Sequence, residues 1–207
     1  MRRKRYNEWT VTAKSWPLTT SAMSVIVTVT SLVWYGHEIK WLHAFLGLPL
    51  LCLFLTWALY TFMYPVFRRN FATNSIAHII WTFLSAVATS FICTSAMKWE
   101  VLLAILPIGL ITAGITHGKN KVSAYVYTFD MLFPFLYTAI LSIVGIFPLT
   151  TIVVFMTLPV ACACSKTMFN SIEGGPHLTK DLGARTANLL HSFSILFAVA
   201  FAIARFI

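Results

Sequence analysis

Residues 42–63 read LHAFLGLPLLCLFLTWALYTFM, a run of 22 residues without any Asp, Glu, Lys or Arg. An α-helix needs about 20 mostly apolar residues to cross the hydrocarbon core of a bilayer. This stretch therefore predicts a membrane-spanning helix. No part of the chain alternates apolar and polar residues in the way that a transmembrane β-strand requires, so we expect every spanning element to be helical.

Six other stretches have the same apolar character. With residues 42–63 they give seven predicted spans in a single membrane domain over residues 1–207: residues 16–35, 42–63, 76–97, 99–116, 125–144, 147–165 and 187–206. The fourth span is short and contains Pro107 and two glycines, which membrane helices tolerate where neighbouring helices satisfy the freed backbone groups. We expect an all-α polytopic transmembrane bundle of about seven helices.

The composition excludes a soluble globular protein and a disordered chain. Hydrophobic residues make up 58% of the chain and charged residues 10%, with a mean hydropathy of +0.80, whereas soluble domains carry about 25% charged residues. The four cysteines lie inside or at the ends of apolar runs. We interpret them as small packing residues, because a disulfide framework or a zinc site would need loop positions.

The basic residues predict the orientation in the membrane. If the N-terminus is cytoplasmic, then Lys40, Lys98 and Arg205 fall outside and the other twelve of the 15 Lys and Arg residues fall inside. Cytoplasmic loops are enriched in Lys and Arg. We therefore expect a multi-pass protein of the cell (inner) membrane with its C-terminus outside. The net charge of +9 is explained by topology and anionic headgroups, so the lipid bilayer is the expected partner and nucleic acid is not.

The chain has six acidic residues, and no two of them lie within five positions of each other: Glu8, Glu38, Glu100, Asp130, Glu173 and Asp181. No metal-binding motif is present, so no metal ligand is assigned. Asp130 lies well inside a predicted span, whereas Glu100 lies at the end of one, and this makes Asp130 a functional candidate. The alternative is a structural carboxyl that is neutral or paired with Lys119 or Lys121.

Two basic segments on the predicted cytoplasmic face could meet a phosphate. His117, Lys119, Asn120 and Lys121 join the fourth and fifth spans, and their two cations, imidazole and amide suit an anion. Arg68 and Arg69 form the second segment. A solvated loop that follows the positive-inside rule has the same composition, so both interpretations stay open.

Several segments carry a family resemblance when they are taken in chain order. They are residues 9–16 with the small residues 21–30, residues 104–110 leading into 115–120, residues 124–137, Leu158-Pro159, and residues 181–191 with Arg185-Thr186-Ala187. In this order they resemble the UbiA superfamily of membrane prenyltransferases. The most similar branch attaches a polyprenyl chain to dihydroxynaphthoate in menaquinone synthesis. The family has the same predicted positions for both termini but nine helices, and loss of a helical pair after Arg69 would leave seven.

The chain departs from this family at both of its aspartate-rich motifs. The first motif should fall near residues 61–67, where Tyr64 matches but no carboxylate occurs. The second should follow Asn120, where the chain continues Lys121-Val122-Ser123. In the family these aspartates hold Mg²⁺ and the diphosphate, so the resemblance implies Mg²⁺ as a cofactor while the residues that would bind it are missing.

Three functions are compatible with these patterns, and whether the chain is an enzyme stays open. The first is an atypical prenyltransferase that binds polyprenyl diphosphate through Arg68, Arg69, His117, Lys119, Asn120 and Lys121, with Tyr64 and Asp130 as further candidates. The second is a non-catalytic relative that binds an isoprenoid or a quinone precursor, or assists an active partner. The third is a small transporter. The resemblance assigns no catalytic residue.

Overall fold

The structure is a computed structural model that describes residues 19–58, 71–115, 121–174 and 181–207. Its helices are Thr19–Trp34, α2 (Trp41–Ala58), α4 (Phe71–Thr94), α5 (Trp99–Ala113), α6 (Lys121–Ile143), the 3₁₀-helix η2 (Leu149–Thr157), α7 (Leu158–Gly174) and α8 (Leu182–Ala204). These residues contain no β-strand. The predicted all-α bundle is confirmed, and each predicted span overlaps a helix.

Four helical segments are long and apolar enough to cross a membrane: Trp41–Ala58, Lys121–Ile143, Leu149–Ile172 and Leu182–Ala204. The shorter apolar helices are Thr19–Trp34, His78–Thr94 and Trp99–Ala113. Large apolar side chains cover the outside of the bundle, with Phe45 80% exposed and Leu42 72% exposed. A soluble monomer rarely exposes so much contiguous apolar surface, whereas a lipid bilayer covers it. The chain is a membrane protein.

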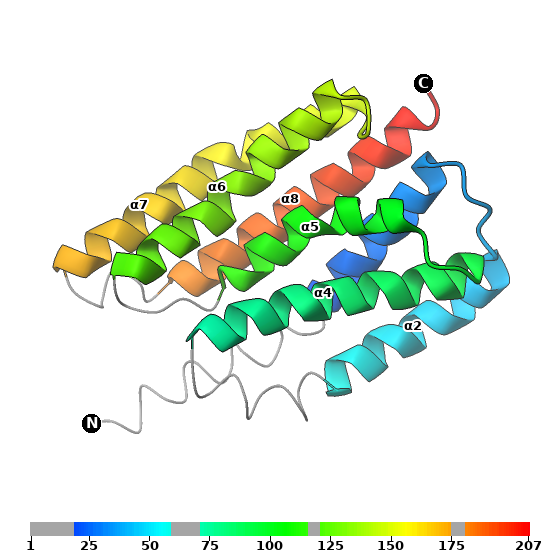
Figure 1. Cartoon of the computed structure of the whole chain (residues 1–207), viewed down its shortest axis with the longest axis horizontal. Coiled ribbons are helices and arrows are strands. Elements are labelled where there is room, and N and C mark those ends of the chain that lie inside the picture. The colour runs from blue at the N-terminus through cyan, green and yellow to red at the C-terminus, as the bar shows by residue number, and fades with distance from the viewer. Residues whose placement is uncertain (1–18, 59–70, 116–120, 175–180) are drawn as a thin grey trace.

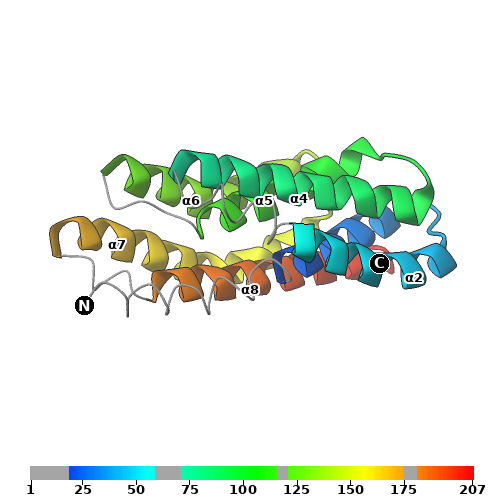
Figure 2. The same ribbon diagram turned by 90° about the horizontal axis from the view of Figure 1, so that it is seen from below.

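The helices run side by side in two layers (Figures 1 and 2). In Figure 2, α4, α5 and α6 form one layer, and α8, the helix Thr19–Trp34 and α2 lie in the other. Within this arrangement α5 packs against α4, α6 and α8, and α7 packs against α6 and α8. The helices around α5 and α8 therefore enclose the main core.

Phenylalanines dominate this core along one face of α8. Phe193, Phe197 and Phe201 are spaced four residues apart, so they lie on the same side of the helix, and all three are fully buried. Phe147 packs edge to face against both Phe197 and Phe201, with ring centroids 5.5 Å apart in each pair. Phe135 of α6 meets Phe193 in the same geometry. This geometry suits the charge distribution of aromatic rings and fixes α8 against α6 and the turn before η2.

Helix α2 lies at the edge of the bundle and packs mainly against α4 (Figure 1). Its buried residues are Ala44, Leu55 and Ala58. Leu55 and Ala58 form a small cluster with Trp81 of α4, separate from the main core. Most of the α2 surface therefore faces away from the protein.

Three predicted span boundaries differ from those of the structure. The third span does not extend to Met97, because α4 ends at Thr94 and Ser95 adopts a left-handed φ of 61°. Ser90 stabilises the turn that follows: its hydroxyl donates to the carbonyl of Ala96 and accepts the N–H of Lys98. Helices α6 and α8 also begin earlier than expected, at Lys121 and Leu182.

The predicted sixth span is not one continuous α-helix. It begins as the 3₁₀-helix η2 and becomes the α-helix α7 at Leu158. Pro159 explains the change, because it has no N–H to bond the carbonyl of Phe155 and its ring crowds that carbonyl. The N–H of Leu158 bonds Phe155 instead. A proline is tolerated in the first turn of the new helix, so α7 continues from there to Gly174.

Candidate functional site

The structure describes two of the predicted site residues. Lys121 is the exposed first residue of α6, and Asp130 lies on the same helix with only 5% of its surface exposed. The other predicted site residues are outside the described residues: Tyr64, Arg68, Arg69, His117, Lys119 and Asn120. Among the described residues, no hydrogen bond or ion pair joins the Asp130 carboxyl to Lys121 or to any other side chain.

The backbone next to Asp130 is also irregular. Pro134 lies inside α6, four residues after Asp130. Because proline has no N–H, the helical hydrogen bond that would end on the carbonyl of Asp130 cannot form. At this buried position of α6, the carboxyl has no side-chain partner among the described residues, and the backbone carbonyl lacks the N–H that a helix normally supplies.

A hydrogen-bonded cluster of Tyr127, Thr186 and the carbonyl of Leu182 ties α6 to α8 nearby. The hydroxyls of Tyr127 on α6 and Thr186 on α8 are 2.7 Å apart and buried. Thr186 also donates to the carbonyl of Leu182, so its single proton is used there and Tyr127 is the donor in the pair. Tyr127 and Thr186 belong to two of the segments that carry the family resemblance.

This cluster lies toward the end of the bundle where α6 and α8 begin and α7 finishes (Figure 1). Lys121 and Arg185 are exposed in the first turns of α6 and α8. The N-terminal end of a helix carries about half a positive charge, which favours anions in its first turn. Two cations and two helix N-termini thus lie at this end, together with the exposed Asp181 and the C-terminal end of α7.

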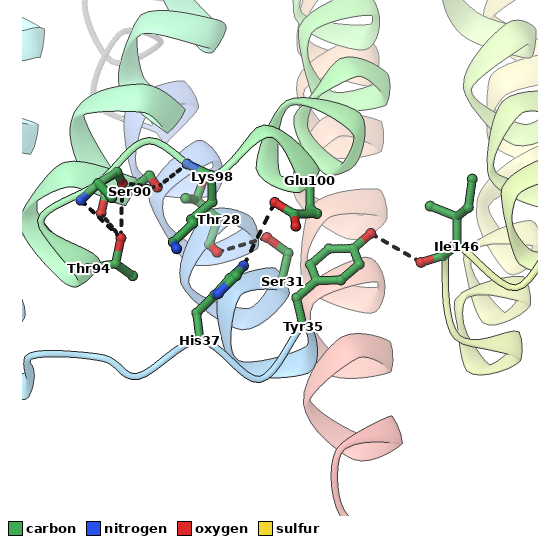
Figure 3. Close-up of polar contacts among 10 residues, drawn as sticks. Thr28, Ser31, Tyr35, His37, Ser90, Thr94, Lys98, Glu100 and Ile146 are labelled. Atoms are coloured by element: carbon green, nitrogen blue, oxygen red, sulfur yellow. Dashed lines mark hydrogen bonds and ion pairs between the residues drawn. The ribbon is translucent and has the colours of Figure 1, made fainter.

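The opposite end of the bundle has its own polar contacts, which the sequence analysis did not single out (Figure 3). His37 Nε2 lies 3.8 Å from Glu100 Oε2, and both side chains are about one-fifth exposed. Tyr35 donates a hydrogen bond of 3.1 Å to the carbonyl of Ile146. Lys40 Nζ donates to Ser95 Oγ over 2.7 Å. These contacts join the connections 35–40, 95–98 and 144–148 at one end of the bundle.

The contacts of this end link residues far apart in the chain, so no local motif reveals them. The sequence offers one indication of them. Because successive predicted spans cross the membrane in opposite directions, the connections 35–40 and 95–98 fall on the same side of the membrane. Chemically the end offers an imidazole beside a carboxylate. We interpret the His37–Glu100 pair as a contact that holds the connection 35–40 against the first turn of α5.

The magnesium site implied by the resemblance does not fit the residues present. Mg²⁺ in a diphosphate site is held by carboxylates, and the described carboxylates are on different elements: Glu38, Glu100, Asp130 and Asp181. In the described part of the chain, no group of three or more His, Cys, Asp and Glu residues could hold a metal ion. The four cysteines, all on described helices, are free thiols.

Comparison of the chain with family models, curated proteins and solved structures found no match.

Proposed function

We propose that the protein binds a polyprenyl diphosphate in the membrane, at the end of the bundle where α6 and α8 begin. The observation that carries the proposal is the buried hydrogen bond between Tyr127 and Thr186. It brings together two segments that resemble the UbiA prenyltransferases, residues 124–137 and 181–191, beneath the basic end of the bundle. In this proposal the chain is a relative that binds the isoprenoid and supports an active partner.

The charge at this end supports an anionic ligand. Lys121 and Arg185 lie in the first turns of neighbouring helices that begin at the same end. A diphosphate is well matched to cationic side chains and to backbone N–H groups at helix N-termini. By sequence, Arg68, Arg69, His117 and Lys119 fall on the same face and add further donors.

The missing aspartates determine how the ligand would be held. Without a carboxylate cage, Mg²⁺ has no site from which to bridge protein and diphosphate, and cationic side chains must contact the phosphate oxygens directly. We therefore expect binding that survives removal of Mg²⁺. The apolar chain of the ligand would pack against the lipid-facing surfaces of the helices, and this contact requires no polar side chains.

The test is an equilibrium binding measurement with radiolabelled farnesyl diphosphate and the full chain in phosphatidylcholine nanodiscs. We expect saturable binding that EDTA leaves unchanged and that the Lys121→Ala/Arg185→Ala variant weakens at least tenfold. The matched control is Lys98→Ala/Arg205→Ala, which removes two charges at the opposite end. No saturable binding by folded protein, or equal loss in both variants, would overturn the proposal.

Prenyl transfer is the second candidate, and the family resemblance favours it. The same preparation is incubated with farnesyl diphosphate, dihydroxynaphthoate and Mg²⁺, and prenylated product is measured. Product that disappears in a Lys119→Ala/Lys121→Ala variant would establish an enzyme that binds diphosphate through cations. Binding without product would support the non-catalytic role.

A transporter is the least supported of the three functions. Asp130 is the one fully buried Asp, Glu, Lys or Arg among the described residues. Ion-coupled transport generally requires a path of polar and ionisable groups through the bundle. A single buried carboxyl does not form such a path.

A further inference from the structure

A groove on the outer surface of the bundle lies between α2 and α4. Its volume is about 420 Å³, and its apolar lining consists of Leu46, Gly47, Leu50, Phe91 and Ile92. Its remaining lining residues are polar, His43 and Ser95. His43 lies in the first turn of α2, and Ser95 directly follows the last residue of α4. The groove therefore has an apolar body and one polar end.

The groove lies beside a close contact between α2 and α4 at Gly47. At Gly47 the two helices are so close that an added Cβ would lie 2.9 Å from Ile92 Cγ2. Beside this contact the walls open outward, with Leu46 59%, Leu50 67% and Phe91 52% exposed. No described residue covers these side chains, so in a membrane the groove faces the lipid.

The polar end of the groove carries a fixed cation. Lys40 Nζ donates to Ser95 Oγ over 2.7 Å, which places the ammonium group beside a lining residue. His43 follows Lys40 by three positions, and one further turn of helix brings the chain to Leu46. Glu38 is the acidic residue of the same connection, and it is exposed.

The depth of this end in the membrane follows from two tryptophans. Trp41 begins α2 and is 66% exposed, and Trp99 begins α5 and is 63% exposed. Exposed tryptophans at the ends of membrane helices sit at the level of the lipid headgroups. Lys40 and His43 adjoin Trp41 in the chain, so the polar end of the groove lies at headgroup depth and its apolar body at acyl-chain depth.

We propose that the α2–α4 groove is a binding site for an anionic phospholipid. One acyl chain packs along Leu46, Gly47, Leu50 and Phe91, and the phosphate contacts Lys40 and His43. The occupant is anionic because the Lys40 ammonium lies beside the polar end at Ser95, and it has an acyl chain because the body of the groove is apolar. This site is at the opposite end of the bundle from the proposed diphosphate site and does not depend on it.

The test measures lipids retained by the delipidated full chain after titration with phosphatidylglycerol or phosphatidylcholine in detergent, using native mass spectrometry. We expect preferential retention of phosphatidylglycerol. Lys40→Gln should weaken that retention about fivefold, since one basic residue near an anionic headgroup has about that effect. Arg205→Gln, which removes a charge at the same end of the bundle but away from the groove, should leave it unchanged.

A second pair of variants tests the apolar body of the groove. Leu46→Trp/Leu50→Trp fills the groove and should reduce retention of both lipids. Leu53→Trp is the matched control, because Leu53 is an exposed residue of α2, 62% accessible, that does not line the groove. Gel filtration and circular dichroism confirm that each variant is folded. Equal retention of the two lipids by the wild type, or retention unaffected by the filled groove, would overturn the proposal.

Discussion

The hydroxyl of Tyr137 on α6 donates a hydrogen bond of 3.2 Å to the carbonyl of Leu103 on α5. That carbonyl lies four residues before Pro107, which has no N–H with which to complete the helical bond. A side chain from the neighbouring helix thus supplies the donor that α5 lacks. This relationship explains how a proline is accommodated in a membrane helix, where no water can satisfy the freed carbonyl.

We expect Tyr137→Phe to destabilise the protein by about 1 kcal/mol, the usual size of an interhelical hydrogen bond in a membrane. The reason is specific, because the variant leaves the Leu103 carbonyl without its donor. Unfolding in a graded series of denaturing detergent measures the change. In a Pro107→Ala background the alanine N–H can bond Leu103, so Tyr137→Phe should cost clearly less there. Equal costs in both backgrounds would show that the hydroxyl does not serve the carbonyl freed by Pro107.

Apolar run lengths predicted the helices of this fold well, because crossing a bilayer imposes a minimum length on each apolar segment. The details they missed depend on single side chains. Ser90 and Thr94 act on the turn after α4 through hydroxyl contacts with Ala96, and Pro159 separates η2 from α7. Such local competition between side chain and backbone does not change the mean hydropathy of a segment, so a hydropathy pattern cannot reveal it.

The predicted site residues stay a prediction, because most of them lie outside the described residues. Charge counting indicated which end of the bundle is basic, and Asp130 was correctly expected inside a helix. The Tyr127–Thr186 bond was not predicted, because the partners are 59 residues apart and nothing in either segment identifies the other. The His37–Glu100 pair was missed for the same reason.

The hydrogen bond between Tyr127 and Thr186 predicts that substitutions of these two residues have non-additive effects on stability. Tyr127→Phe removes the donor and Thr186→Val removes the acceptor, and we expect each variant to lose about 1 kcal/mol of stability. The double variant should lose less than the sum, because the second change removes a group that has already lost this hydrogen bond. The same detergent unfolding assay gives all four values. Strict additivity would contradict a direct interaction between the two hydroxyls.

The crossing of α4 and α5 is limited by the size of residue 109. A Cβ added at Gly109 would lie 3.7 Å from the backbone Cα of Ile79, an ordinary van der Waals contact. Gly109→Ala should therefore be tolerated and can gain up to about 1 kcal/mol from helix propensity. Gly109→Leu must push the α4 backbone away and should cost about 1–3 kcal/mol or more. Thermal unfolding of both variants checks the contrast, with Gly183→Ala as control because a Cβ there meets nothing within 4 Å.

The ends of the bundle give a topology prediction that single cysteines can test. The connections that contain Glu38 and Met97 lie at the same end as the C-terminus, whereas Asp181 lies where α8 begins (Figure 1). An impermeant maleimide added to intact cells should therefore label Glu38→Cys, Met97→Cys and Phe206→Cys but leave Asp181→Cys unlabelled. The wild type provides the background, because its four cysteines all lie within helices. After the cells are opened, Asp181→Cys should react as well.

This labelling experiment tests the arrangement of the helices and their orientation in the membrane independently. The fold requires positions 38, 97 and 206 to share one side and position 181 to lie on the other. The charge distribution adds that the shared side is the outside, since it carries Lys40, Lys98 and Arg205 against twelve basic residues on the other face. Labelling of Asp181→Cys alone in intact cells would keep the bundle and reverse its orientation. Labelling of Glu38→Cys and Asp181→Cys from the same side would contradict the arrangement of the helices.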